Sequence, residues 1–295
     1  MELRAPVPDE APAVLEVLVA RDIADLGAPD CTLGDVLDEW GLADFELAAD
    51  ARVAEVDGRI VAYGSVRREG TFAVVAPEFE GRGIGTRLLR WAEGREAERP
   101  GGRSRQWVAG ANERAAELLR GAGYELVRSY WRMDRPLDES VVAGEPPAGV
   151  RVRSLDVDGD AATLHELDAL SFAGAPDFHP MSLQAFRDEH LGAHDLAPEL
   201  SAVAELGGGV VGFALARNWK HEGVGFIDVL GVHPDHRRVG IASTLLRSAF
   251  AGFAAAGLAR AQLGVASDNP SARRLYERVG MTPRLRFDTY ERPRP

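Results

Sequence analysis

Residues 232–246, VHPDHRRVGIASTLL, contain the turn that decides the fold of this chain. A related stretch lies 157 residues earlier, at 75–89, and reads VAPEFEGRGIGTRLL. Laid over each other without a gap, residues 75–124 and 232–281 are identical at 16 of 50 positions. The matches include glycines, a proline and an asparagine, where the backbone restricts the choice of residue. The repeat predicts two copies of one fold unit.

Each copy joins a strand to a helix through a glycine-containing turn. In copy two, a β-type run at 226–232 leads through that turn into a helical pattern whose apolar face carries Leu245, Leu246, Ala249, Phe250 and Phe253. The first N–H groups of a helix have no partner inside it, so such a turn can bind an anion. The repeat therefore predicts a phosphate-binding loop around Gly240 and another around Gly83.

A second motif follows downstream. In copy two, residues 262–265 predict a strand, and Asn269-Pro270 predicts a helix with Asn269 as its cap and Gly280 at its end. The sequence V-x-P-x-x-R-x-x-G-x-A, followed by N-x-x-A-x-x-L-Y-x-x-x-G, resembles the signature of the GNAT N-acetyltransferase superfamily. Because both halves carry related motifs, the whole chain is similar to tandem GNAT proteins, with the layout of the mycothiol synthases.

The resemblance implies an α/β fold with two tandem GNAT domains, each a twisted mixed sheet of the α+β type flanked by helices. Two parallel strands in each sheet are expected to splay apart, and in copy two these would end at Val232 and Val265. We predict an N-terminal domain at 1–135, a linker rich in glycine and proline at 136–149, and a C-terminal domain at 150–295.

Further local patterns support this organisation. Hairpins are predicted at 53–63 and 202–213, which have glycine-containing turns. Near the start of the second half, an amphipathic helix is predicted with Ala162, Leu164, Leu167 and Leu170 on its apolar face. The connection 217–223 is longer than its counterpart, and either lines a substrate site or is an ordinary surface loop.

Composition narrows the classes of function. The chain has 295 residues and a formal net charge of −12, which argues against a nucleic-acid partner. No apolar run is long enough to cross a membrane, and the N-terminus does not resemble a signal peptide. The single cysteine, Cys31, cannot form an internal disulfide, so we expect a cytoplasmic protein. The sequence predicts no metal site and no particular oligomeric state.

The resemblance also implies the chemistry. GNAT enzymes move an acetyl group from acetyl-CoA, the co-substrate expected here, to an amine on a small molecule or a protein. The amine attacks the thioester directly, and backbone groups of the glycine loop hold the pyrophosphate. By position in the family motif, the expected CoA-binding residues are Leu230, Gly231, Val232, Arg237, Arg238, Val239, Gly240, Ile241, Ala242 and Asn269 in copy two, and Val75, Arg82, Gly83, Ile84 and Gly85 in copy one.

Two residues are predicted to be catalytic. Tyr276 lies at the family's tyrosine position, and would protonate the departing thiolate. Mycothiol synthases have a glutamate where this chain has Phe226, so Asp228, two residues along on the same strand face, is the candidate to accept the amine proton or to hold the ammonium. His233 and His221 are weaker candidates for the base.

Copy one departs from the motif at three positions. Glu80 replaces Arg237, Leu119 replaces Tyr276, and Thr71 replaces Asp228. We therefore predict that copy one is catalytically inert and binds CoA weakly or not at all. A non-catalytic CoA-binding sensor or pseudoenzyme remains an alternative function, as does transfer of a longer acyl group.

Overall fold

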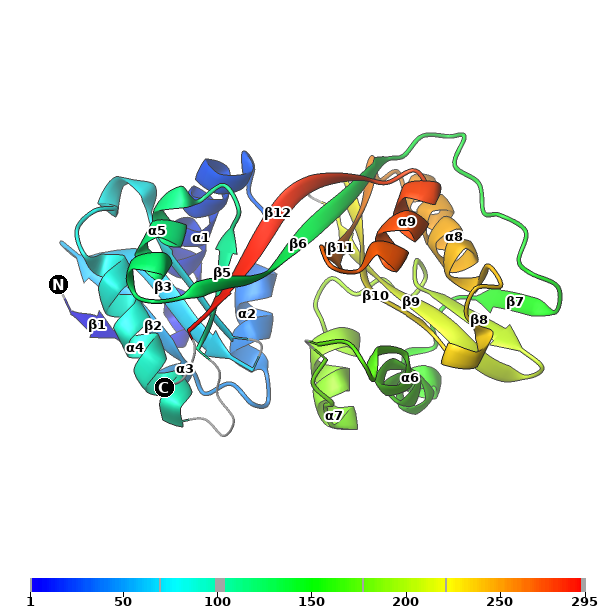
Figure 1. Cartoon of the computed structure of the whole chain (residues 1–295), viewed down its shortest axis with the longest axis horizontal. Helices are drawn as coiled ribbons and strands as arrows, with labels where there is room; N and C mark the ends of the chain where they lie inside the picture. The colour runs from blue at the N-terminus through cyan, green and yellow to red at the C-terminus, as the bar shows by residue number, and fades with distance from the viewer. Residues whose placement is uncertain (1, 69, 99–103, 177, 221, 293–295) are drawn as a thin grey trace. The chain divides into compact units, whose positions relative to one another are not determined.

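The computed structural model describes residues 2–68, 70–98, 104–176, 178–220 and 222–292. Its internal contacts divide the chain into two compact units (Figure 1). Unit 1 comprises Met1–Tyr130 and Leu285–Pro295, and unit 2 comprises Trp131–Arg284. Each unit is a mixed sheet flanked by helices, which confirms the predicted fold class.

Unit 1 has the strand order β1-β2-β3-β4-β5-β12. Its only parallel contact among the described pairings joins β4 to β5, at Thr71 with Gln106 and Phe72 with Trp107. The elements of this unit are β1 Leu3–Arg4, η1 Pro8–Glu10, α1 Ala11–Leu26, α2 Leu33–Gly41, α3 Leu47–Asp50, β2 Ala51–Val56, β3 Arg59–Arg67, β4 Gly70–Val75, η2 Pro77–Phe79, α4 Ile84–Glu98, β5 Arg105–Ala109 and α5 Glu113–Gly121.

Unit 2 has the strand order β6-β11-β10-β9-β8-β7. Here β10 and β11 are the parallel pair. The elements are β7 Val150–Arg153, α6 Val157–Phe172, α7 Leu183–Phe186, a π-helical turn η3 Arg187–Leu191, β8 Ala202–Leu206, β9 Gly209–Trp219, β10 Val224–Val232, η4 Pro234–His236, α8 Ile241–Ala255, β11 Arg260–Ala266 and α9 Pro270–Arg278.

Two strands, β6 Glu125–Pro136 and β12 Thr282–Glu291, have residues in both units. In unit 1, residues 287–291 of β12 pair antiparallel with β5. In unit 2, Asp134 of β6 accepts hydrogen bonds from Arg260 and from Gln262 of β11, at 2.6 and 2.9 Å. The contact-based units divide the chain differently from the repeat, because unit 1 also includes residues 285–295. The domain boundaries 1–135 and 150–295, which follow the repeat along the sequence, therefore remain predictions.

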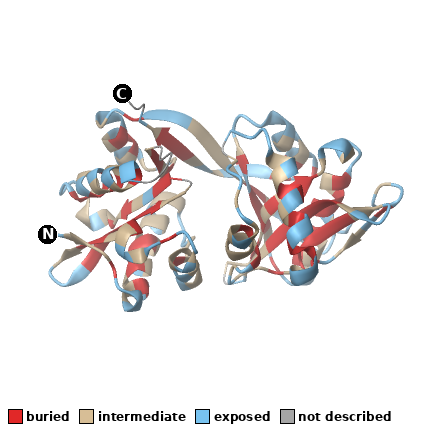
Figure 2. Ribbon diagram, turned by 90° about the horizontal axis from the view of Figure 1, so that it is seen from below, coloured by how far each residue is buried: buried red, intermediate tan, exposed pale blue. Residues whose placement is uncertain are grey.

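Each hydrophobic core lies between a sheet and its helices, as the buried strands and inner helix faces show (Figure 2). The predicted apolar face of α8 is confirmed: all five of its residues are buried. Both predicted hairpins are confirmed as well, as β2–β3 and β8–β9. No helix in the described part of the chain is long and apolar enough to span a bilayer.

The repeat extends to an ion-pair cluster at the start of each unit. Arg4 contacts Glu10 and Glu55 at 2.6 and 2.7 Å. In unit 2, Arg153 contacts Asp160 and Glu205, both at 2.6 Å. In each case the arginine joins the first helix to the second strand of the sheet.

Two local predictions need correction. On α6, Ala162 is exposed and Leu170 is 50% exposed, so the predicted apolar face is wrong at both positions. Asp168, in contrast, is only 5% exposed, so an aspartate lies on the buried face. The segment 217–223 is not a loop throughout, because β9 continues to Trp219. Residues 217–219 pair with β10 as regular strand, which shortens the connection.

Candidate functional site

A gap between parallel strands is the central feature of unit 2. Strand β10 pairs with β11 only from Val224 to Ile227. Its pairing with β9 shifts register between Ile227 and Val229, which places Asp228 at a β-bulge. A bulge bends its strand. Beyond it, residues 229–232 pair with β9 but have no described pairing with β11. The predicted splaying of these strands is therefore confirmed.

The glycine loop of unit 2 leads directly into α8. Gly240 is the N-cap residue, with φ of 99°, a left-handed conformation that favours glycine. No side chain caps this helix. Its first N–H groups thus remain available to an anion, and the positive end of the helix dipole lies at the same place. This cradle fits a phosphate group.

The residues predicted to bind CoA in unit 2 lie on four neighbouring parts of the chain: β10, the turn after it, the start of α8, and the cap of α9. Arg237 donates hydrogen bonds to the carbonyls of Val232, at 3.1 Å, and Ser171, at 2.6 Å, so it fixes the strand end beside the loop. Val239 is 58% exposed. The side chain of Asn269 caps α9 by accepting the N–H of Ala272 at 3.0 Å, as the sequence predicts. The remaining members, Leu230, Gly231, Arg238, Ile241 and Ala242, lie on β10, in the turn or in the first turn of α8.

Tyr276 lies on α9 and is 8% exposed. Its ring belongs to the same apolar cluster as Val232, Val265 and Ile241, which are residues of the two splayed strands and of α8. Burial raises the pKa of Tyr276 to about 12. Its hydroxyl has no hydrogen-bond partner among the described residues. Tyr276 therefore stays protonated at neutral pH, the state that a proton donor requires.

Asp228 is held by two positive partners. Its Oδ2 accepts hydrogen bonds from His190 Nδ1 at 2.9 Å and from Arg217 Nη2 at 3.1 Å. Burial alone would raise the pKa of Asp228, but the charge of Arg217 and the bond from His190 hold it well below its usual range. The same contact raises the pKa of His190, although burial opposes this. Asp228 is thus a fixed anion, poorly suited to accept a proton at neutral pH.

Several members of this polar network could not be predicted from the sequence. Arg217 also contacts Asp195 at 3.0 Å. On α6, which packs against β10, burial raises the pKa of Asp168 to about 6, while His190 and His165 oppose the rise. One signal was available, because Asp168 interrupts the apolar spacing of its helix and a charge on a buried face is unusual. Nothing in the sequence indicated that His190 approaches β10.

The two weaker candidate bases and Phe226, at the family's glutamate position, lie elsewhere. His233 lies in the turn after β10, where its Nδ1 accepts the N–H of Asp235 at 3.3 Å. Phe226 stacks on Trp219 with ring centroids 4.4 Å apart. His221 lies outside the described residues.

Copy one has the glycine loop without the residues predicted to be catalytic. Its strand β4 pairs with β3 without a register shift, so Thr71 is not at a bulge, and Thr71 donates a hydrogen bond to Glu96 at 2.7 Å. Leu119 is buried in the core. The charge of Glu80 is balanced by Arg21 at 2.5 Å and by Arg114 at 3.0 Å.

A cavity of about 440 Å³ adjoins this loop in unit 1. Val75, Gly83, Ile84 and Gly85 line it, together with Leu119. The guanidinium of Arg82 lies over the ring of Phe79, 4.6 Å from its centroid. Four of the five residues predicted to bind CoA in copy one therefore line a cavity, and Arg82 is not among its lining residues.

Comparison with known proteins gives consistent matches. The sequence model of the acetyltransferase (GNAT) family matches residues 24–124 and 162–281. A mycothiol acetyltransferase of Thermobispora bispora is 33% identical over 214 residues, which is 71% of each chain. A second one, from Streptomyces bingchenggensis, is 31% identical over 253 residues, covering 80% of this chain and 77% of the relative.

Two solved structures share the architecture. A GCN5-related N-acetyltransferase from Sphaerobacter thermophilus has a TM-score of 0.79 and 28% identity, over 99% of this chain and 96% of the other. A tandem GNAT protein from the clavulanic acid biosynthesis pathway has a TM-score of 0.74 over the whole of both chains. Because its sequence identity is only 16%, this second match supports a shared fold and nothing more.

Proposed function

Because this chain belongs to the GNAT family and is an N-acetyltransferase, we propose that unit 2 transfers the acetyl group of acetyl-CoA to a primary amine of a small molecule. The observation that carries this proposal is the end of β10–β11 pairing at Ile227, beside the uncapped N-terminus of α8. A strand gap exposes backbone groups that can pair with an amide-containing arm, and the helix end suits its phosphates. The mycothiol acetyltransferase relatives support a small-molecule acceptor.

The reaction joins the amine nitrogen to the acetyl carbon and breaks the carbon–sulfur bond. We assign Tyr276 to donate the proton that the leaving sulfur takes up, because it is protonated and belongs to the apolar cluster that includes Val232 and Val265 of the two strand ends. A backbone N–H near Leu230 would stabilise the oxyanion.

The amine must lose a proton before or during attack. Asp228 is held as an anion by its two partners, so we assign it to hold the ammonium in place. Asp168 is the carboxyl of this unit whose raised pKa, about 6, best matches proton removal near neutral pH.

A matched pair of variants tests which unit is active. Gly240 and Gly83 occupy equivalent loops and both have positive φ, 99° and 77°, so an aspartate strains each backbone in a similar way and repels phosphate in each. With acetyl-CoA and a panel of amines, thiol release should be lost in Gly240→Asp and retained in Gly83→Asp. The opposite pattern would place catalysis in unit 1.

The same assay separates the alternative function. If acetyl-CoA binds but no amine releases thiol from the unmodified protein, the chain is a CoA-binding sensor. Longer acyl-CoA donors in the assay test the acyl-group preference.

A further inference from the structure

His190 is a mostly buried histidine beside the bulge of β10, and the reaction proposed for unit 2 does not use it. It belongs to η3, the π-helical turn in which the N–H of Gly192 reaches the carbonyl of Arg187 at 2.7 Å. Such turns occur frequently at functional sites. The ring of His190 packs against the fully buried ring of Phe186, with centroids 5.1 Å apart. Only 13% of the His190 side chain is exposed, so its ring interacts mainly with other residues.

Asp228 and Arg217 fix the orientation of this histidine. Nδ1 of His190 lies 2.9 Å from Oδ2 of Asp228. Because a carboxylate only accepts hydrogen bonds, Nδ1 carries the proton in the neutral ring and Nε2 carries the lone pair. Arg217 donates to the same Oδ2 at 3.1 Å and to the carbonyl of Glu189 at 3.1 Å. It thereby connects the bulge of β10 to the turn that carries His190.

The two carboxylate oxygens of Asp228 differ in their surroundings. His190 and Arg217 both donate to Oδ2, and Oδ1 accepts no hydrogen bond from a described residue. The Asp228 side chain is 19% exposed, so it is not sealed from solvent. Oδ1 can therefore receive the N–H groups of an ammonium while Oδ2 stays bound. Without the bond from His190, the carboxylate could turn more freely about its last torsion, which is a broad one.

Acidic groups outnumber basic ones around His190. The set comprises Asp228 of β10, Arg217 of β9, Asp168 and His165 of α6, Glu189 of η3, and Asp195, which binds Arg217. The three carboxylates nearest to His190 raise its pKa from the ordinary value of 6.5, although burial opposes them. His190 therefore changes its charge close to neutral pH, directly beside the carboxylate that we assign to hold the ammonium.

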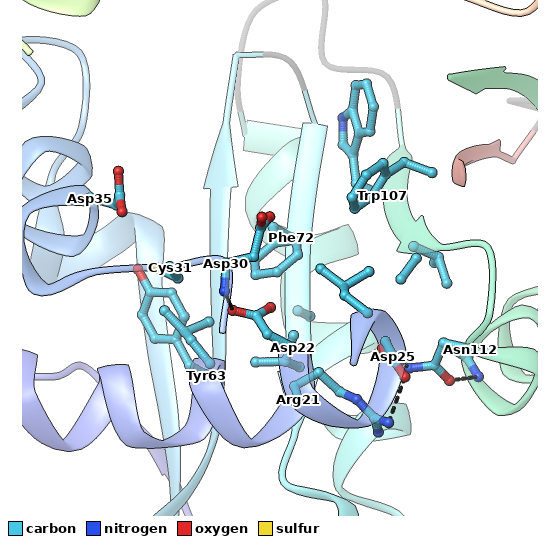
Figure 3. Close-up of a pocket in the computed structure, with 18 of the residues that line it drawn as sticks. Arg21, Asp22, Asp25, Asp30, Cys31, Asp35, Tyr63, Phe72, Trp107 and Asn112 are labelled. Carbon is cyan, nitrogen blue, oxygen red and sulfur yellow. Dashed lines mark hydrogen bonds and ion pairs between the residues drawn. The ribbon is translucent and has the colours of Figure 1, made fainter. Parts of the chain in front are cut away.

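Unit 1 has no equivalent of this pair. All seven histidines of the chain lie between positions 165 and 236, so unit 1 contains none. Thr71 matches Asp228 in the repeat. A pocket of about 470 Å³ lies against β3, β4 and β5 of unit 1 (Figure 3), and Asp25, one of the carboxylates that line it, is paired with Arg21 at 2.6 Å. The combination of a titratable ring and a carboxylate at a strand bulge is thus a feature of unit 2.

Building on the acetyl transfer proposed for unit 2, we infer that His190 is a positioning residue for Asp228 and that its charge sets how strongly the site holds the acceptor ammonium. The bond from Nδ1 keeps Oδ2 occupied, so Oδ1 receives the ammonium. A neutral His190 leaves Arg217 as the remaining positive partner of Asp228, and the ammonium binds. A protonated His190 places a second positive charge beside Asp228 and repels the ammonium. Affinity for the amine should therefore rise with pH as His190 loses its proton.

Steady-state kinetics of the full chain between pH 7 and 9 test this inference, above the pKa of Asp168 at about 6. Thiol release is measured at saturating acetyl-CoA with 2-phenylethylamine, ethanolamine and putrescine, which stay largely protonated in this range, as a lysine side chain does. With the unmodified protein, the KM for the amine should fall by about tenfold as the pH rises, because one neighbouring charge is removed.

Two substitutions separate the hydrogen bond from the charge. His190→Asn places an amide N–H where Nδ1 lies, so it keeps the bond to Asp228 but cannot change its charge. Its KM for the amine should be low throughout and should not depend on pH. His190→Ala also removes the bond, and its KM at pH 9 should be about tenfold higher, the usual effect of losing a hydrogen bond to a charged group. The KM for acetyl-CoA should stay within about twofold in both variants, because only binding of the amine is affected.

His179→Asn is the matched control, because it removes an exposed histidine of unit 2. It should keep the pH dependence of the unmodified protein. NMR of the histidine rings gives a direct readout of the pair. The His190 signal, assigned by its loss in His190→Asn, should titrate above pH 6.5 in the unmodified protein and at lower pH in Asp228→Asn. Melting temperatures show whether each variant is folded.

Three results would overturn the inference. One is the same pH dependence of the amine KM in His190→Asn and the unmodified protein. Another is an unchanged KM in folded His190→Ala. The third is a His190 titration that Asp228→Asn does not move. If no amine releases thiol from the unmodified protein, the acetyl-transfer proposal fails and this inference fails with it. If release is normal and the His190 variants behave as the unmodified protein does, the inference alone fails.

Discussion

Replacing Tyr276 by phenylalanine separates its chemical role from its packing. The substitution keeps the ring in the core cluster that contains Val265 and Ile241, and removes a hydroxyl that has no hydrogen-bond partner among the described residues. If the hydroxyl protonates the leaving sulfur, turnover should fall by roughly 10²- to 10⁴-fold. That range corresponds to about 3 to 5.5 kcal/mol in activation free energy.

Stability provides an independent measure of the same side chain. No hydrogen bond is lost, so the free energy of unfolding near pH 7 should change by less than about 1 kcal/mol. The pKa of Tyr276 is raised in the folded state from 10.0 to about 12, so its contribution to stability is present below pH 10 and is lost as the pH rises towards 12. Between pH 10 and 12, the free energy of unfolding of the unmodified protein should fall by about 2.5 kcal/mol more than that of Tyr276→Phe.

The assay is thiol release from acetyl-CoA on the most active amine, combined with urea unfolding between pH 7 and 12. Tyr290→Phe is the control, because Tyr290 is a buried tyrosine of unit 1, and it should leave turnover unchanged. Unmodified turnover in Tyr276→Phe would refute the assignment, and would leave Tyr276 as a core aromatic residue of α9.

Three further outcomes are expected. Burial raises the pKa of Asp168 from 3.8 to about 6, so its contribution to stability is present below pH 4 and is lost as the pH rises through 6. Asp168→Asn should therefore raise the free energy of unfolding at pH 8 by up to about 3 kcal/mol. At pH 4 it should have little effect, and denaturant unfolding at both pH values measures the difference. Gly240→Ala adds backbone strain without charge, so it should weaken acetyl-CoA binding less than Gly240→Asp does. Equal losses of affinity in calorimetry would show that backbone strain, and not the added charge, causes the loss of binding. Arg153→Gln leaves Asp160 and Glu205 without their shared cation and should lower the free energy of unfolding by about 1 to 3 kcal/mol, whereas no change in the melting temperature would show that the cluster does not contribute to stability.

The strongest sequence signals were local and imposed by the backbone. Gly240, Asn269 and the hairpin turns each require a particular backbone geometry, and each lies where the local residue pattern predicted it. The apolar face of α8 could also be predicted, because its spacing matches one side of a helix and no charged residue interrupts it.

The polar network around Asp228 could not be predicted in this way. Its members are 11 and 38 residues away from Asp228 along the chain, at Arg217 and His190. Their meeting depends on how α6, η3 and the sheet pack together, which periodicity does not report. Asp168 could not be predicted for a related reason, because the buried face of its helix was assigned from apolar residues alone.

The membership of residues 287–291 in unit 1 has a consequence for synthesis of the protein. Strand β5 ends at Ala109, but the strand that pairs with it ends at Glu291, so 182 residues must be added between the two. At roughly 5 to 20 residues per second, the ribosome needs about 10 to 40 seconds for that interval. During this time the β5 edge of the nascent chain is without its native partner, and an open strand edge is prone to pair with other chains. The first half of the sequence is therefore the last to complete its sheet.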